Sequence, residues 1–289
     1  MSDSTPAIEV SALRKSYGDH EALRGIDITV GRGEVFGLLG PNGAGKTTTV
    51  EILEGYRSRS DGEVSVLGHD PAGRSIELRR RIGIVLQAGG IYSHITPREA
   101  LAHWAGFYRH PRAVEEVLAL VGLSDSADMR SRRLSGGQLR RLDFALALIG
   151  DPELIFLDEP TTGFDPEARR TAWETIRSLQ ALGKTILLTT HYLEEAQVLA
   201  DRVAIVKDGR ILAIGAPREL GVGSGAAGNR YNVAYRGPDG EPVEQETDDP
   251  TRLLHELTGR ALAEGWALED LSVARPTLED VYLELTADG

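Results

Sequence analysis

Eight consecutive residues fit the pattern G-x-x-x-x-G-K-[ST], which binds nucleotide phosphates: Gly40, Pro41, Asn42, Gly43, Ala44, Gly45, Lys46 and Thr47. The three glycines let the backbone turn tightly and bring its N–H groups up to phosphate oxygens. Lys46 supplies a positive charge for the outer phosphates, and the Thr47 hydroxyl can ligate Mg²⁺. The segment is therefore predicted to bind a nucleoside triphosphate, unless it is only a glycine-rich turn with a chance lysine.

A pair of carboxylates follows a second apolar run. Residues 154–157 are continuously apolar, as expected for a buried parallel strand, and Asp158 and Glu159 come directly after them. A carboxylate at such a strand end can hold the Mg²⁺ shell, and its neighbour can accept a proton from an attacking water. The alternative is that both side chains are solvated or cap a turn.

Two more polar residues stand at the ends of predicted strands. Gln87 follows the apolar segment 82–86, and His191 follows the β-branched segment 184–190. Ligands of open α/β sheets bind at the carboxyl ends of the strands, so Gln87 can approach Mg²⁺ or the attacking water. His191 can donate a hydrogen bond to a phosphate. Taken alone, a glutamine or histidine at such a position is more often a loop or structural residue.

A second helix start suits an anion. Ser135 and Gln138 have the spacing of a capping box, and Gly136 and Gly137 expose backbone N–H groups in the first turn. As an isolated segment it could be only the beginning of a helix. Farther along, Asp165 precedes a proline and is predicted to cap the next helix.

The elements that must position these residues alternate between strand and helix patterns. Strands are predicted over residues 8–13 and 22–30, with a turn over 15–20 that contains Tyr17, and over 34–39 before the phosphate-binding loop. A helix follows the loop over 47–54. Residues 88–133 change to a helical pattern, in which Thr96 and Glu99 form a capping box. Tyr17 is either a packing residue or an aromatic face for an adenine ring.

The C-terminal quarter has a different composition. Residues 215–228 are rich in glycine and alanine and are predicted to be a linker. Strands are predicted over 231–235 and 243–247, and helices over 250–263 and 278–285. From residue 216 onward the sequence has 15 acidic and six basic side chains, so most of the net charge of −12 lies there. We expect a small accessory α+β domain with no catalytic constellation.

Composition excludes several classes of protein. An acidic balance argues against a broad nucleic-acid surface, which needs clustered lysine and arginine. The absence of cysteine excludes disulfides and thiolate metal sites. No apolar run reaches the roughly 18 residues of a membrane-spanning helix, and no signal peptide is recognisable at the N-terminus.

The order and spacing of these motifs over residues 8–215 resemble the ATP-binding subunits of ABC transporters. The resemblance rests on the phosphate loop, Gln87, Leu-Ser-Gly-Gly-Gln at 134–138, Leu-Ile-Phe-Leu-Asp-Glu at 154–159, and His191. The segment 134–138 is the most specific, because other phosphate-loop enzymes lack it. The chain is most similar to bacterial multidrug and daunorubicin-resistance exporters, also in its segment 275–286. Two positions depart from the usual pattern, Leu139 and the phenylalanine before Asp165.

The resemblance implies an α/β fold with a phosphate-loop ABC-type ATPase core, an antiparallel β subdomain and a helical insertion. It places the ATP-binding domain at 1–215, the helical subdomain at about 88–150, and the linker with the accessory domain at 216–289. It also implies roles for individual residues. ATP contacts are implied for Tyr17, which would stack on adenine, and for Gly40, Pro41, Asn42, Gly43, Ala44, Gly45, Lys46, Thr47 and Thr48.

Further roles concern the metal, catalysis and a second subunit. Thr47, Gln87 and, through water, Asp158 would serve Mg²⁺. Glu159 would be the general base, and Lys46 and His191 would contact the terminal phosphates. Ser135, Gly136, Gly137 and Gln138 would close on the ATP of another copy in a head-to-tail dimer, with Asp165 near that joint.

The implied function is ATP hydrolysis that drives transport through a separate integral membrane permease, with the segment 87–97 as docking edge. The subunit would be cytoplasmic and peripheral on the inner face of the membrane, with no nucleic acid as partner. Two alternatives remain at this stage: a soluble ABC-type ATPase that acts on a non-transport partner, and a non-hydrolytic nucleotide-sensing module. A single phosphate loop and the absence of a long heptad run disfavour the first, and the presence of Glu159 and His191 disfavours the second.

Overall fold

The computed structural model describes residues 5–85, 93–220 and 231–287. The chain separates into two compact units, residues 1–212 and 213–289. Gln87 and the apolar side chains of Ile91 and Tyr92, which belong to the expected docking edge, lie outside the described residues.

A six-stranded sheet forms the centre of the first unit. Its order is β5 (Ile82–Val85), β6 (Leu154–Asp158), β7 (Thr185–Thr190), β3 (Val35–Leu39), β8 (Arg202–Lys207) and β9 (Arg210–Gly215). In this spatial order, each pair of neighbouring strands from β5 through β6, β7 and β3 to β8 is parallel. Every residue of β3 and β7 is buried, because helices cover both faces of such a sheet. The carboxyl ends of β3, β6 and β7 therefore lie at one edge, where the residues that follow them meet.

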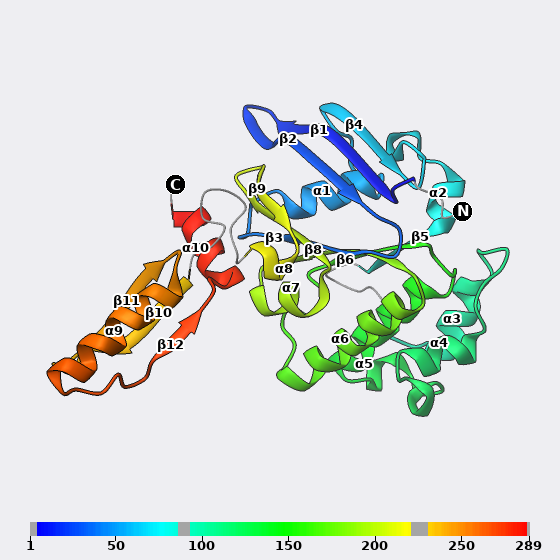
Figure 1. Ribbon diagram of the computed structural model, residues 1–289. Coiled ribbons are helices and arrows are strands. Elements are labelled where there is room, and N and C mark those ends of the chain that lie inside the picture. The colour runs from blue at the N-terminus through cyan, green and yellow to red at the C-terminus, as the bar shows by residue number, and fades with distance from the viewer. Residues whose placement is uncertain (1–4, 86–92, 221–230, 288–289) are drawn as a thin grey trace. The chain divides into compact units, whose positions relative to one another are not determined.

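A smaller antiparallel sheet has the order β2 (His20–Val30), β1 (Ile8–Tyr17) and β4 (Asp61–Val66). Figure 1 shows the helix α1 (Lys46–Leu53) between this sheet and the central one. The predicted turn over 15–20 is wrong in its extent. The β1–β2 ladder continues to the pair Tyr17 and His20, so only Gly18 and Asp19 turn, and Gly18 adopts the left-handed conformation with φ 57°.

Three helices form the predicted helical insertion: α3 (Pro97–Ala105), α4 (Val114–Leu120) and α5 (Gly136–Leu148). They pack on one another in Figure 1 and share a core with the central sheet. The capping box of Thr96 and Glu99 is confirmed, with Pro97 as first residue of α3. Two further helices, α6 (Pro166–Ala181) and α7 (Leu193–Leu199), follow β6 and β7. The helix α2 (Ile76–Arg81), which was not predicted, leads into β5.

The second unit has its own small core. Its sheet has the order β11 (Pro242–Thr247), β10 (Tyr231–Arg236) and β12 (Ser272–Ala274), and all pairs are antiparallel. Val233 and Tyr235 pack against Leu257 of α9 (Pro250–Glu264). The short α8 (Pro217–Leu220) stands where the linker was expected to begin, and α10 (Leu278–Ala287) ends the unit. The α+β character predicted for this region is confirmed.

Candidate active site

The phosphate loop connects β3 to α1, as the pattern requires. Gly43 and Gly45 adopt left-handed φ values of 82° and 103°, which residues with a side chain rarely reach. Gly40 is needed for a different reason, because a Cβ atom there would lie 2.2 Å from the carbonyl oxygen of Val206. The glycines therefore determine the conformation of the loop. The helix α1 begins at Lys46, with Gly45 of the loop as its N-cap. The N-terminus of α1 faces the loop, which favours an anion there.

Lys46 is almost completely buried, with 5% of its surface exposed. Its Nζ donates to the carbonyl oxygens of Gly40 at 2.8 Å and Pro41 at 3.1 Å. The same Nζ lies 3.7 Å from Oε1 of Glu159. Burial lowers the pKa of Lys46, while Glu159 and Asp158 act in the opposite direction. The ammonium group therefore connects the phosphate loop with the carboxylates at the end of β6.

Asp158 lies between two hydroxyl groups. Thr189 Oγ1 donates to Asp158 Oδ1 at 2.5 Å, and Thr47 Oγ1 lies 3.4 and 3.5 Å from the two carboxylate oxygens. Hydroxyl and carboxylate oxygens are the ligands that Mg²⁺ prefers, usually together with water and substrate phosphates. Thr47 and Asp158 therefore fit a magnesium-bound nucleotide. Among the described residues no cluster of three acidic or histidine side chains forms a separate metal cage.

Glu159 has an unusual backbone conformation, with φ 46°. Its N–H group donates to both the carbonyl oxygen (3.2 Å) and Oγ1 (3.0 Å) of Thr189 on the neighbouring strand. Thr162 Oγ1 donates to Glu159 Oε2 at 3.1 Å. Left-handed conformations of this kind cost free energy and persist only where surrounding contacts hold them, which is common at active sites. The carboxylate is thus directed by its neighbours and is 12% exposed.

His191 follows β7 and stands beside this carboxylate. Its Nδ1 lies 3.4 Å from Glu159 Oε1, although this approach lacks the alignment of a hydrogen bond. The imidazole packs on the ring of Tyr192 with centroids 4.1 Å apart. The structure therefore brings together Lys46, Thr47, Asp158, Glu159 and His191, which come from three separate segments of the sequence. Such a group can hold a triphosphate, orient a water molecule and take up its proton.

The glycine-rich helix start and Asp165 lie around a separate cavity. Ser135 Oγ accepts from the Gln138 N–H at 3.2 Å, and Gln138 Oε1 accepts from the Ser135 N–H at 2.8 Å, so the predicted capping box is confirmed. Asp165 caps α6 by accepting from the Ala168 N–H. A cavity of about 650 Å³ lies between α5 and α6, and Ser135, Gly136, Gly137 and Asp165 all line it.

Tyr17 lies at the end of β1 and is 40% exposed. The Lys15 ammonium lies 5.0 Å and the Arg57 guanidinium 5.2 Å from its ring centroid. An adenine contact by this ring remains a prediction. Gln87, predicted to serve Mg²⁺, lies outside the described residues.

Two residues of the site were not found from the sequence. Thr189 contacts both carboxylate residues, and its only signal was a hydroxyl in the penultimate position of a buried strand. Glu54, at the C-terminal end of α1, is 8% exposed. Burial, followed by repulsion from Asp158 and Glu51, raises its pKa to about 8. A glutamate at a helix end gives no indication in the sequence that it is buried near Asp158.

The fold and this constellation define a phosphate-loop nucleoside triphosphatase. Residues 23–162 match the family model described as "ABC transporter". The chain is 42% identical to the daunorubicin resistance ATP-binding protein DrrA3 of Streptomyces coeruleorubidus over 98% of its own length and 96% of that protein. It is 41% identical to the Nod factor export ATP-binding protein I of Rhizobium meliloti (strain 1021), over 98% of this chain and 88% of the other. Among solved structures, one described as the ATP-binding subunit of an ABC transporter has a TM-score of 0.67 and 29% identity, covering 74% of this chain and 91% of that one.

The chain belongs to the family of ABC transporter ATP-binding subunits, and it binds and hydrolyses ATP. The resemblance stated from the motifs is thereby confirmed, as is the α/β fold with a phosphate-loop ATPase core. Subunits of this family act together with membrane subunits and as dimers. In the part of the chain that the structure describes, none of the helices combines the length and the apolar character needed to traverse a lipid bilayer.

Proposed function

We propose that this subunit hydrolyses ATP as a head-to-tail homodimer and so drives the export of a drug-like or lipid-like molecule through a separate integral membrane permease. The proposal that the subunit hydrolyses ATP rests on one observation. Four side chains meet at one edge of the central sheet: Lys46, Asp158, Glu159 and His191. The names of the similar proteins, which refer to daunorubicin resistance and Nod factor export, support export of such a molecule. No nucleic acid is involved, in agreement with the net charge of −12.

Each residue of the site has a proposed task. Gly40, Gly43 and Gly45 shape the loop, and Lys46 binds the outer phosphates. Tyr17 stacks on the adenine, and Pro41, Asn42, Ala44, Thr47 and Thr48 complete the nucleotide contacts. Mg²⁺, when bound with ATP, would be held by Thr47, Asp158 and Gln87 and would neutralise phosphate charge during the reaction.

Glu159 acts as general base on the attacking water. Its Oε2 is fixed by the Thr162 hydroxyl, so that Oε1 points toward the region between Lys46 and His191. His191 contacts the terminal phosphate and keeps the water and the base in line. Because a loose phosphoryl-transfer transition state needs little covalent assistance, these contacts act through positioning and electrostatics.

The substitution Glu159→Gln tests this assignment. The variant should bind ATP, accumulate the closed dimer and hydrolyse ATP at least about 100-fold more slowly, since a general base contributes about 10² to 10⁴. Glu244→Gln, which changes an exposed glutamate of the second unit, is the matched control. Turnover of the Glu159→Gln protein at the wild-type rate would overturn the assignment. Nucleotide binding without turnover in the wild-type protein would instead indicate a nucleotide-sensing module.

The membrane partner is proposed to meet the segment 87–97 and the helix α3 that follows it. Three aromatic side chains on this helix and just beyond it contact one another with ring centroids 5.4 to 6.0 Å apart: His103, Trp104 and Phe107. Trp104 is 38% and Phe107 63% exposed, and exposed aromatic groups of this kind are typical of protein interfaces. The subunit would thereby be held at the cytoplasmic face of the membrane.

The substitution Trp104→Ser tests this docking surface. It should weaken co-sedimentation with permease-containing membranes and leave the ATPase rate of the free subunit unchanged. Unaltered co-sedimentation would exclude this surface.

We also propose that residues 1–215 form the ATP-binding domain, with a helical subdomain over about 88–150, and that 216–289 form a linker and accessory domain. The separate core of Val233, Tyr235 and Leu257 supports this division. Limited proteolysis followed by mass spectrometry should cut first between residues 215 and 231. Initial cleavage inside either proposed domain would contradict the boundary.

A further inference from the structure

A fully buried carboxyl group lies behind the active site, and the proposed mechanism does not use it. Glu195 of α7 has no exposed surface. Its Oε1 accepts from Thr161 Oγ1 at 2.7 Å and from Trp173 Nε1 at 3.1 Å. Its Oε2 has no hydrogen-bond partner in the described part of the chain. Both donors are neutral groups, and no lysine or arginine among the described residues forms an ion pair with this carboxyl.

Such an arrangement is costly for stability. A buried carboxylate is normally paired with a cation or fully hydrogen-bonded, and a well-packed apolar side chain is often more stable in its place. A leucine at this position would remove the unsatisfied oxygen, but it would leave the buried Thr161 hydroxyl and the Trp173 N–H group without their acceptor. The side chain is therefore better explained by the segments that it connects than by a contribution to stability.

Each of the three connected segments adjoins a residue proposed for the active site or for the dimer joint. Thr161 stands two residues after Glu159, in the turn that leaves β6, and is itself completely buried. Trp173 lies on α6, the helix that begins after its cap Asp165. Glu195 lies four residues after His191, in the first turn of α7. One carboxyl oxygen thus joins the turn of the general base, the helix of the proposed dimer joint and the helix that follows the histidine.

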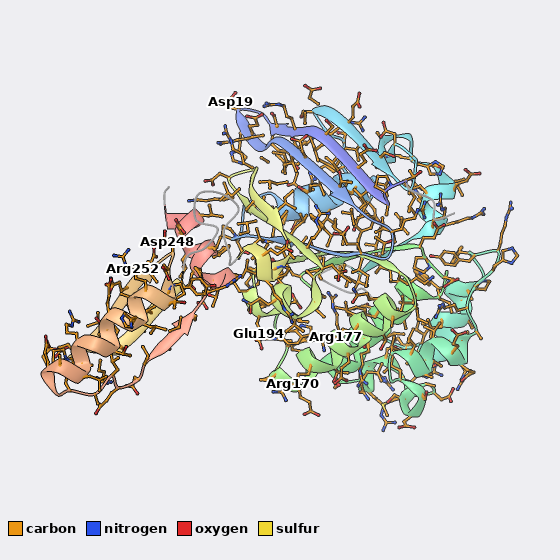
Figure 2. The ribbon with its side chains drawn as sticks, in the orientation of Figure 1. Asp19, Arg170, Arg177, Glu194, Asp248 and Arg252 are labelled. Carbon is orange, nitrogen blue, oxygen red and sulfur yellow. The ribbon has the colours of Figure 1, made fainter. Side chains whose placement is uncertain are left out.

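A second set of contacts joins α6 to α7 and to the residues just before α7, nearer the surface. The Arg169 guanidinium of α6 lies 4.9 Å from the ring centroid of Tyr192, and Tyr192 packs on His191. Figure 2 labels Arg170 and Arg177 of α6 and Glu194 of α7 in the region where these two helices lie side by side. Glu194 reaches Arg169 at 3.9 Å but is 68% exposed, so screening by water makes this pair weak. The buried contact of Glu195 is therefore the stronger connection between α6 and α7.

We propose that Glu195 is a positioning residue for ATP hydrolysis. By holding Thr161 and Trp173, it keeps Glu159, His191 and Asp165 in one arrangement, so that α6 and α7 move together when the dimer closes. The proposal rests on the roles of Glu159 and His191 given above. It predicts that loss of the acceptor oxygen lowers the rate of the hydrolytic step more than the affinity for ATP.

Two substitutions of Glu195 test separately its negative charge and its hydrogen-bond acceptor oxygen. Glu195→Gln keeps the size of the side chain and a carbonyl oxygen that can accept from both donors, and its kcat should stay within about twofold of wild type. Glu195→Leu removes the acceptor at similar size and should lower kcat about 10- to 100-fold with little change in KM, because a small misplacement of catalytic groups costs that much. Glu194→Gln on the same helix is the control. Thr161→Val, which removes a single donor, serves if Glu195→Leu does not fold.

The measurements are steady-state ATPase kinetics and thermal unfolding of the full chain. If Glu195→Leu and Thr161→Val lower only the unfolding temperature and retain wild-type kcat, the residue is merely structural and the proposal is wrong. A kcat loss of equal size in Thr161→Val, Glu195→Leu and the double variant would confirm that one contact is responsible. The variant Glu159→Gln, assayed in the same experiment, distinguishes a failure of the proposed function from a failure of the proposed role of Glu195. If it turns over normally, the proposed function fails; if it is inactive while both acceptor-contact variants are normal, only the role of Glu195 fails.

Discussion

Glu54 provides a quantitative test of the electrostatics around the proposed magnesium site. The carboxyl lies at the C-terminal end of α1 and is 8% exposed. Burial is the main cause that raises its pKa from 4.5 to about 8, and the negative charges of Asp158 and Glu51 add to it. The folded protein therefore binds a proton at Glu54 over a pH range in which the unfolded chain has released it.

The sign of the stability change follows from this difference. Below pH 4.5 the carboxyl is protonated in both states, and the stability associated with Glu54 is fully present. As the pH rises from 4.5 to about 8, only the unfolded chain loses its proton, so the free energy of unfolding falls by about 1.4 kcal/mol per pH unit. Between pH 5 and pH 8 this amounts to a loss of about 3.5 kcal/mol, because the slope is only partial near either pKa, and well above pH 8 the contribution becomes constant.

The substitution Glu54→Gln removes the titration and keeps the shape of the side chain. Urea unfolding of wild type and variant at pH 5, 6, 7 and 8 gives the difference in free energy, in which the contributions of all other groups largely cancel. The variant should gain about 3.5 kcal/mol relative to wild type over this range. Glu77→Gln, at an exposed position of α2, corrects for the loss of one carboxyl as such. Parallel stability curves for wild type and Glu54→Gln would refute the reasoning.

Two further predictions concern the support of the site. Thr189→Val removes the hydroxyl that contacts Asp158 and the Glu159 N–H group and should lower kcat about tenfold, whereas Thr189→Ser should restore it; equal rates in both variants would show that the hydroxyl is dispensable. Gly40→Ala places a Cβ atom 2.2 Å from the Val206 carbonyl oxygen. The variant should lose about 1–3 kcal/mol of folding stability and should bind ATP more weakly. Gly73→Ala, where nothing lies within 4 Å, is its control in urea unfolding and nucleotide titration.

Features that depend on neighbouring residues could be predicted from the sequence. The capping boxes of Thr96 with Glu99 and of Ser135 with Gln138 each involve residues three positions apart, so residue type and spacing determine them. The phosphate loop is equally local. By contrast, the unexpected extension of β1 to Tyr17 follows from cross-strand pairing with His20, because a two-residue turn needs little more than Gly18.

Contacts between distant segments could not be predicted from the sequence. Thr189 reaches Glu159 because β6 and β7 are neighbours in the sheet, and 30 positions separate the two residues. Glu195 reaches Thr161 across 34 positions because α7 packs against the turn that follows β6. A single sequence carries no direct signal for strand order or helix packing. The residues proposed to act chemically were therefore recognisable by type and spacing, while Thr189 and Glu195, which contact their surroundings, were not.

The two candidate anion sites, at Lys46 and at Ser135, lie in separate parts of the first unit. Ser135 Oγ already accepts from the Gln138 N–H group, so its hydroxyl hydrogen remains able to donate to an anion. Lys46, in contrast, is directed toward Glu159 at the edge of the central sheet. In the proposed two-fold head-to-tail dimer, Ser135 of one copy would complete the Lys46 site of the other, and the reverse. Lys46→Ala and Ser135→Ala homodimers should both be inactive. Mixing them in equal amounts gives dimers of which half are mixed, each with one intact site, so about a quarter of the wild-type ATPase rate should return. If each chain completed its own site, the mixture would remain as inactive as its components.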